Sequence, residues 1–483
     1  MNIKGISVNV GKALLVSALF MFISIIVSII EGYDSAFAPL LISFIITLLV
    51  GAFPFIFVRN TDSLSLNDGF LTIFLSWMLS FIFGMLPYVL WGGEFTLINA
   101  WFESVSGYTT TGATILTDIE SLPKSLLFWR SSTHYIGGLG VIVFLLLVLP
   151  QASPYRLKLT NMEMSTLSKG GYRYNSAKVI KVITGVYLFF TIAAFLSLWA
   201  AGMTFFDAVN HAFSLASTGG FSTRNLSIGY YGSDLINIIV MIFMAICALH
   251  FGLVYAVFVT RSFKPMNNTV VKYYFGSMAV CSIIVASALI SDGGYSNWGR
   301  ALMDSSFTVI SYMSTCGFGI CDNSAWPWIA GIVLLFVSFQ GGCSGSTTGA
   351  IKVDRILIAF KAIANEVNRR IRPNAVSQVK MSGHHLTDSS VHSVMIYIVT
   401  YMILIFISIL AVMLCGSDVS EAVSGVIASI GCVGPGLGEL GAMDNYSAVP
   451  AMSKLIYAFD MFLGRVEIFP ILVVFSMILR RGR

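Results

Sequence analysis

The sequence predicts an all-α integral membrane protein: four pseudo-symmetric helix–pore-loop–helix units around one central pore, preceded by an N-terminal helix pair. Three observations predict this fold class. The composition is strongly apolar, ten nearly uncharged runs are long enough or almost long enough to cross a bilayer, and four tracts of small residues recur between these runs.

The composition excludes an ordinary soluble protein. Of 483 residues, 56% are hydrophobic and 11% are charged, whereas soluble domains carry roughly 25% charged residues. A soluble fold could not bury so much apolar surface, so the expected solvent is a lipid bilayer.

The candidate spans follow one another along the whole chain. The first run is 18 residues long, more than the about 7–15 residues of a signal-peptide core, which predicts a retained membrane helix. The runs are 13–30, 40–58, 70–91, 128–149, 182–203, 235–259, 272–291, 326–360, 391–415 and 455–479.

The distribution of Lys and Arg predicts the orientation. If the N-terminus is cytoplasmic, most of the 28 basic residues fall in cytoplasmic segments, and many acidic residues fall on the other side. Both termini are therefore predicted to be cytoplasmic. The net charge of +5 is explained by this topology and does not indicate nucleic-acid binding.

Four outer connections share one pattern: a weakly charged stretch, a tract of small residues, and then the next span. The stretches 95–108 and 205–216 are predicted to be short half-helices. Aligned on their fourth residue, the tracts place glycine at 112, 220, 317 and 434. The tracts are 109–114, 217–222, 314–319 and 431–436.

This repeat predicts five regions. Residues 1–64 form the N-terminal two-helix region, and four pore units follow, the third of which has a broken second helix. The pore units are 65–160, 161–264, 265–375 and 376–483.

The tracts have the chemistry of an ion filter. Non-helical backbone inside a membrane is tolerated only where protein or a watery cavity satisfies it, and glycine allows the angles that aim successive carbonyls inward. Such oxygens can replace the water shell of a monovalent cation. A single tract is more simply an external turn, but four in equivalent places favour a filter. None contains Asp, Glu, Lys or Arg, which argues against divalent-cation and anion pores.

A second small-residue cluster, 340–349, interrupts the run 326–360. Because glycine is unfavourable in helices, the cluster is either an unwound segment or a close helix-packing surface. Arg465 and Glu467 lie inside the last run, near Asp460. Charges at this depth are expected to face a cavity or a partner. Two interpretations stay open: a local Arg–carboxylate pair, or a cation beneath the filter.

These residues resemble the TrkH-type bacterial potassium uptake family, within the TrkH/KtrB/HKT superfamily of potassium transporters. The four tracts, the segment 342–352 and the extra N-terminal helix pair carry the resemblance, and the helix pair favours the TrkH branch. The resemblance implies a potassium filter, in which Gly112 favours potassium over sodium, whereas Cys316 and Cys432 are less familiar at their positions. The implied filter residues are Thr110, Thr111, Gly112, Thr218, Gly219, Gly220, Thr315, Cys316, Gly317, Cys432, Val433 and Gly434.

The resemblance also implies a gate and partners. The segment below the filter would block or open the pore together with Arg465, and the implied gating residues are Gly345, Ser346, Thr347, Gly349, Lys352 and Arg465. A homodimer with one pore per subunit is implied, in the bacterial inner membrane. A cytosolic, TrkA-like nucleotide-binding ring would dock near 151–181 and 352–380. The resemblance further implies that potassium is the transported ion and that nucleotide binds only to that partner subunit.

Three alternatives remain. A sodium-permeable transporter of the same fold would share the tracts. A sodium-coupled solute transporter would show inverted repeats, whereas these repeats share one orientation. A membrane enzyme would need a catalytic constellation, and the sequence contains none. The histidines, including His134, and the seven cysteines show no metal-ligand spacing and are assigned no role.

Overall fold

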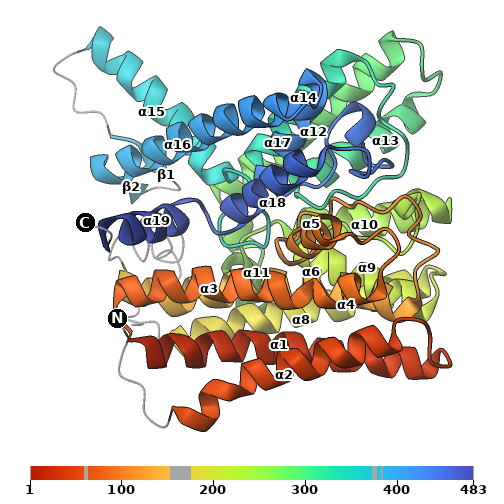
Figure 1. The fold of residues 1–483 in the computed structure, drawn as a ribbon. Helices are drawn as coiled ribbons and strands as arrows, with labels where there is room; N and C mark the ends of the chain where they lie inside the picture. Colours follow the sequence, from red (N-terminus) through yellow and green to blue (C-terminus); the bar gives the residue numbers. More distant parts are fainter. Residues whose placement is uncertain (1, 59–63, 153–175, 373–377, 382–383, 482–483) are drawn as a thin grey trace.

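The computed structural model describes residues 2–58, 64–152, 176–372, 378–381 and 384–481. It is a bundle of helices whose longest members lie side by side, with both termini at the same end (Figure 1). The long helices are α1 (Ile3–Ile30), α2 (Phe37–Phe57), α3 (Leu66–Gly84), α6 (Lys124–Ala152), α8 (Ser176–Ala200), α12 (Thr269–Ser291) and α16 (Asp388–Leu414). A short helix, α4 (Leu86–Trp91), follows α3.

The all-α membrane fold predicted from the sequence is confirmed. Among the described residues, six helices are long and apolar enough to cross a membrane, or eight if each bent pair is counted as one span. Their outer faces expose large apolar side chains such as Leu49 on α2 and Phe406 on α16, which are 65% and 64% exposed. Surfaces of this kind suit contact with lipid.

Four short helices precede the four small-residue tracts, as predicted. Each begins at a residue whose side chain accepts a hydrogen bond from the first turn, namely Thr96, Thr204, Asn297 and Asp418. The helices are α5 (Leu97–Tyr108), α9 (Phe205–Ser217), α13 (Trp298–Met313) and α17 (Val419–Ile430).

Within the described ranges three spans are broken, although the sequence predicted a break only in 326–360. There, α14 (Trp328–Gln340) and α15 (Val353–Ile371) are separated by the non-helical segment 341–352. In addition, α10 (Asp234–Cys247) and α11 (Phe251–Thr260) meet at 99°, and α18 (Ala451–Arg465) and α19 (Phe469–Arg481) meet at 109°. The second bend follows from the positive φ angles of Glu467 and Ile468, 61° and 59°.

The remaining elements are small. They are the 3-10 turns η1 (Ser227–Tyr231), η2 (Lys264–Met266) and η3 (Gly438–Leu440), and an antiparallel pair of two-residue strands, β1 (Lys380–Met381) and β2 (His384–His385).

The N-terminal pair, α1 and α2, crosses at two glycines. A Cβ atom on Gly11 would lie 2.6 Å from the Gly51 carbonyl oxygen, so the two backbones meet without side chains between them. Small residues allow such contacts between membrane helices. On its other side, α1 reaches the end of α5, where the Tyr108 hydroxyl donates to Ser17 Oγ at 2.8 Å.

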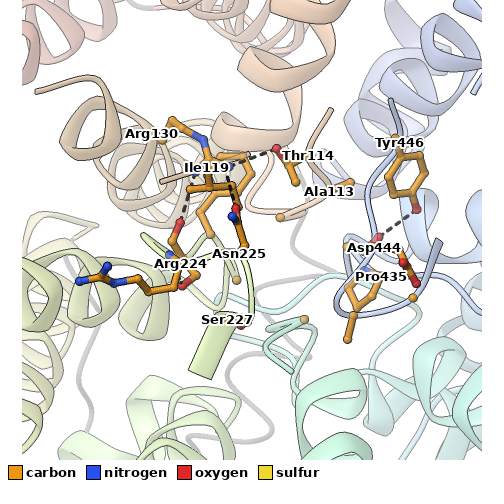
Figure 2. Close-up of a pocket in the computed structure, with 18 residues that line it drawn as sticks. Ala113, Thr114, Ile119, Arg130, Arg224, Asn225, Ser227, Pro435, Asp444 and Tyr446 are labelled. Atoms are coloured by element: carbon orange, nitrogen blue, oxygen red, sulfur yellow. Dashed lines mark hydrogen bonds between the residues drawn. The ribbon is translucent and has the colours of Figure 1, made fainter. Parts of the chain in front are cut away.

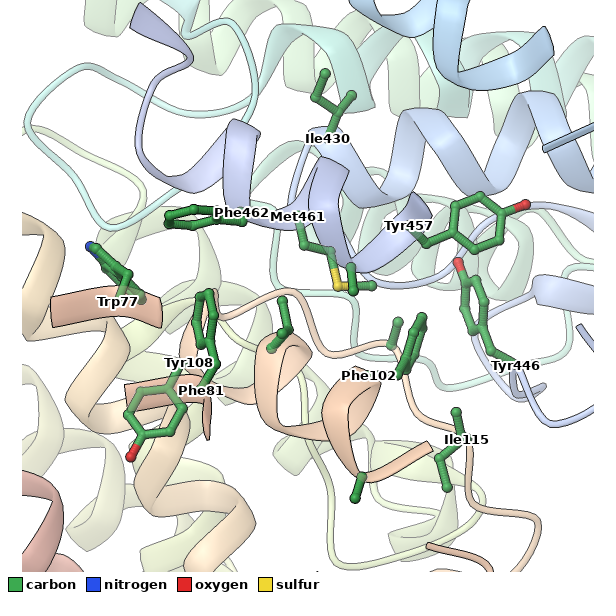
Figure 3. Packing of buried hydrophobic residues seen from close by; sticks show 14 of the residues in the cluster. Trp77, Phe81, Phe102, Tyr108, Ile115, Ile430, Tyr446, Tyr457, Met461 and Phe462 are labelled. Carbon is green, nitrogen blue, oxygen red and sulfur yellow. The ribbon is translucent and has the colours of Figure 1, made fainter. Parts of the chain in front are cut away.

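The first and last parts of the chain share one apolar core. Side chains of α3 and α5 face those of α17 and α18 across it (Figure 3). The Phe81 and Phe462 rings lie 5.4 Å apart in an edge-to-face contact. This packing places the end of α5 beside the end of α17, so the first and fourth tracts become neighbours.

Candidate ion filter and the segment beneath it

The four tracts meet in a closed ring. Each ring glycine faces a carbonyl oxygen of another tract so closely that a Cβ atom there would collide with it. The contacts are Gly112 with the Gly219 oxygen, Gly220 with Cys316, Gly317 with Val433, and Gly434 with Thr111. Each tract thus contacts the next along the chain, and the fourth returns to the first.

The backbone of the tracts repeats almost unchanged. One or two positions after each short helix stands a left-handed residue, with φ of 53° at Thr110, 56° at Thr218, 54° at Thr315 and 51° at Cys432. The next amide, such as that of Thr111, donates to the carbonyl five residues earlier at 2.8–3.0 Å. This is the Schellman arrangement, which usually uses glycine. Non-glycine residues in this conformation are strained, and such strain clusters at functional sites.

In each tract, one residue stands between the left-handed residue and the ring glycine. Its carbonyl oxygen is the one that faces the ring glycine of a neighbouring tract. These residues are Thr111, Gly219, Cys316 and Val433. The side chains of Cys316 and Val433 pack in apolar clusters, and the Cys432 thiol lies 3.5 Å from the Met461 carbonyl oxygen. The side chains of the two cysteines of the predicted filter are therefore buried among other parts of the protein.

All four ring glycines line one pocket on one side of the ring (Figure 2). Among the described residues that line it, Arg130, Arg224 and Asp444 are charged. Arg224 pairs with Glu120 and Asp207 at 3.3 and 3.1 Å. Burial raises the pKa of Asp444, and the charges of Asp322 and Glu439 raise it further.

A buried ion pair, which the sequence analysis did not assign, supports the first tract. Arg130 Nε lies 2.8 Å from Glu103 Oε1, and both side chains are at most 1% exposed. Glu103 also accepts from Thr114 Oγ1 and the Ile115 amide, at 3.0 and 3.1 Å. Arg130 donates to the Ser222 carbonyl at 3.3 Å, so the pair links the first two tracts. Glu103 inside a predicted half-helix was the available signal, because buried charges in membrane segments need partners.

The non-helical segment 341–352 lies against the other side of the ring. Thr347 Oγ1 is 3.2 Å from Thr218 Oγ1, and the Gly349 amide donates to Thr315 Oγ1 at 3.1 Å. A Cβ atom on Gly349 would collide with the Gly431 carbonyl oxygen. The segment therefore contacts three tracts, which contradicts the alternative of a continuous helix with a small-residue packing face.

Arg465 ends α18 beneath the ring and is 3% exposed. Its Nη1 donates to the Thr347 carbonyl, and its Nη2 donates to the Gly137 carbonyl at 3.3 Å. Within the described part of the chain it forms no ion pair. Of the two interpretations left open by the sequence, a local Arg465–carboxylate pair is therefore not found among these residues.

The two nearby carboxylates have other partners. Glu467 pairs with Arg355 at 2.9 Å, and Asp460 accepts from Ser408 Oγ at 2.7 Å. The backbone explains why Glu467 pairs with Arg355 and not with Arg465. The helix breaks after Arg465, and Glu467, with φ of 61°, turns toward α15.

The other predicted gating residues lie in or at the end of this segment. Gly345 has φ of 80° and packs against the His250 ring. Ser346 Oγ donates to the Cys343 carbonyl at 2.7 Å. Lys352, 6% exposed, precedes α15 and donates to the Thr348 carbonyl. All six predicted gating residues thus belong to one cluster below the ring.

The predicted docking regions are described only in part. Residues 153–175 of the region 151–181, and 373–377 of the region 352–380, lie outside the described residues. All seven cysteines are free. Within the described ranges, His, Cys, Asp and Glu side chains form no group of three or more able to hold a metal.

Comparisons with known proteins give one consistent result. The family model described as "TrkH: Cation transport protein" matches residues 38–289 and 294–483. The Trk system potassium uptake protein TrkH of Escherichia coli (strain K12) is 33% identical over 486 residues, covering 99% of each chain. TrkG of the same strain is 33% identical over 440 residues, covering 90% of each. The crystal structure of the potassium transporter TrkH from Vibrio parahaemolyticus superposes with a TM-score of 0.89 at 31% identity, covering 98% of both chains.

Proposed function

The chain belongs to the TrkH family of cation transport proteins, and from this premise we propose that it takes up potassium through the ring of four tracts. It is a multi-pass membrane transport protein and not an enzyme. The observation that carries the proposal is the ring itself, in which each glycine faces a backbone carbonyl of a neighbouring tract. The identity of the transported ion is inferred from relatives that are named potassium uptake proteins.

The geometry suits a monovalent cation without its water shell. Backbone carbonyls are the ligands of known potassium filters, and no charged side chain stands in any tract. The short helices α5, α9, α13 and α17 all end at the ring. Their C-terminal ends carry partial negative charge, which favours a cation at the centre.

The segment 341–352 and Arg465 form the proposed gate. The segment contacts three tracts, and its Thr347 carbonyl accepts from Arg465. A guanidinium below a cation filter repels the ion and holds the segment in place. In this proposal, the pore opens when the segment moves away from the ring and Arg465 loses its contact with Thr347.

The wider assembly is proposed from the family and from charge. The positions of Lys and Arg favour cytoplasmic termini in the bacterial inner membrane, and both termini lie at the same end (Figure 1). The name "Trk system" of the relatives supports partner subunits. We propose a homodimer and a nucleotide-binding ring at the exposed basic end of α15, where Arg369 and Arg370 lie.

Two measurements test the function. In a bacterium lacking potassium uptake, the chain is expected to restore growth at low potassium. In liposomes, the purified protein is expected to carry potassium in preference to sodium. Membrane-inserted protein that neither restores growth nor moves potassium would contradict the proposal. Equal sodium flux would indicate the sodium-permeable alternative, and flux of an organic solute would indicate a coupled transporter.

A further inference from the structure

His134, in α6, bridges two of the four units at the ring. Its Nδ1 lies 2.6 Å from the Gly107 carbonyl oxygen, in the last turn of α5. Its Nε2 accepts from the Phe221 amide at 3.1 Å, directly after the ring glycine of the second tract. The His134 imidazole is fully buried and stacks on the Phe221 side chain, with ring centroids 4.1 Å apart.

The two partners determine the state of the imidazole. A carbonyl oxygen only accepts and a backbone amide only donates, so Nδ1 carries the hydrogen and Nε2 is the acceptor. Both imidazole nitrogens therefore form hydrogen bonds. One partner is a backbone atom of α5, and the other is a backbone atom of the second tract. The side chain therefore fixes the backbone of the second tract relative to the end of α5.

The second tract leaves space for the His134 imidazole. Its middle residue is Gly219, where the other tracts have Thr111, Cys316 and Val433. Gly219 does not have a positive φ, so its backbone does not require glycine. A Cβ atom there would instead collide with the His134 ring. Gly219 and His134 therefore form a matched pair, because the absent side chain leaves the space that the imidazole occupies.

We propose that His134 is a positioning residue for ion selectivity, which holds the Gly219–Gly220–Phe221 backbone in the geometry of the filter. This inference rests on the proposed function, because it assigns a determinant to the same filter. The Gly219 carbonyl oxygen faces Gly112, and the Cys316 oxygen faces Gly220. A shift of the second tract would thus change its contacts with the first and third.

Two amide variants separate the two hydrogen bonds. In His134→Asn, the amide nitrogen can replace Nδ1 and donate to Gly107, but nothing reaches Phe221. In His134→Gln, the amide oxygen can replace Nε2 and accept from Phe221. His211→Asn is the matched control: His211 is also fully buried, but its Nε2 meets the Ser222 hydroxyl at 3.0 Å and not a backbone amide.

The measurement is the potassium-to-sodium permeability ratio in liposomes, with thermal unfolding in detergent to verify folding. His134→Asn is expected to lower the ratio about tenfold, because it leaves a buried amide unpaired beside the filter. His134→Gln and His211→Asn are expected to keep the ratio near that of the unmodified chain. His134→Asn with an unchanged ratio, or His134→Gln that loses selectivity as fully as His134→Asn, would overturn the inference.

A second pair of variants keeps the inference testable if His134→Asn does not fold. Gly219→Ala alone is expected to abolish selective uptake, and His134→Ala with Gly219→Ala is expected to recover part of the potassium flux by removing the collision. No recovery would overturn the matched pair. If the unmodified chain carries no potassium, the proposed function itself fails, which is a separate outcome from a selective chain whose His134 variants remain selective.

Discussion

At the scale of single residues, the four tracts of the ring share one backbone geometry, which is reached without glycine at the left-handed position. The left-handed position is Thr in three tracts and Cys in the fourth, with φ of 51–56° in all four. A residue with a Cβ atom is strained there, yet none of the four is glycine. The next position holds four different residues, Thr111, Gly219, Cys316 and Val433. Because the side chains differ there while the backbone is constant, the backbone is the part that the proposed function requires.

The ring glycines lead to the first prediction. Gly112→Ser is expected to lower the potassium-to-sodium permeability ratio, because φ of 87° strains a serine and its Cβ atom would displace the Gly219 carbonyl. The ratio is measured from reversal potentials. Gly276→Ser, in α12, is the control, since a Cβ atom there meets open space. Unchanged selectivity in Gly112→Ser would remove Gly112 from the filter.

The buried pair Glu103–Arg130 leads to a stability prediction. Arg130→Met leaves the Glu103 charge buried without its partner, which costs about 3–5 kcal/mol. The double variant Glu103→Gln with Arg130→Met is expected to be more stable than Arg130→Met alone. Thermal unfolding of both single variants and the double variant gives the coupling. Additive losses would show that the two side chains act independently.

The residues that sequence reasoning found and missed differ in a physical way. Thr110 to Gly112 and their counterparts were predictable because the same short pattern recurs four times between apolar runs. His134 and Arg130 were not assigned, because each acts through partners far along the chain, Phe221 and Glu103. The Arg355–Glu467 pair was not predicted for the same reason, since the two residues are 112 positions apart.

At the scale of elements, broken helices surround the ring. The break 341–352 was predictable from its glycines, whose cost in a helix is well established. The bend between α10 and α11 has no such signal. There, His250 starts the new helix by accepting from the Gly252 amide at 3.0 Å, a role that many polar residues can fill. Sequence patterns therefore locate an unwound segment more readily than a sharp bend.

The segment 341–352 leads to a prediction about gating. Thr347→Val keeps the volume of the side chain but removes its hydroxyl, which lies 3.2 Å from Thr218 Oγ1 and 3.4 Å from the Ala216 carbonyl. The segment is then held less firmly, so potassium flux without any partner subunit is expected to rise severalfold. Thr400→Val in α16 is the control, because its hydroxyl bonds only within its own helix. Equal basal flux in both variants would argue against the gate.

At the scale of the whole molecule, the ring closes between the two ends of the chain. Phe81 of α3 and Phe462 of α18 meet in the core that joins the first and fourth units. The fold class and an arrangement of four units around one pore were predicted from the sequence, but the side-chain contacts that join the first unit to the fourth were not, because they depend on packing between segments far apart. The junctions also differ, since His134 bridges the first two tracts, whereas Tyr446 donates to the Gly434 carbonyl at 3.0 Å near the fourth.

The charges around the mouth lead to the last prediction. Asp444 is the one carboxylate among the described residues that line the pocket above the ring (Figure 2). Arg224 and Arg130, which also line it, are each paired with carboxylates. An unneutralised negative charge at the mouth raises the local cation concentration. Asp444→Asn is expected to reduce potassium uptake roughly threefold to tenfold at low ionic strength, and less at high salt.

The pH dependence of uptake distinguishes this role from a structural one. Burial and the neighbours Asp322 and Glu439 raise the pKa of Asp444, so falling external pH neutralises it earlier than an ordinary aspartate. Uptake is therefore expected to fall on acidification, and Asp444→Asn should lack that step. Glu439→Gln removes one of the charges that raise this pKa, so it should move the midpoint to lower pH. An unchanged midpoint in Glu439→Gln, or an unchanged pH profile in Asp444→Asn, would assign the titration to another group.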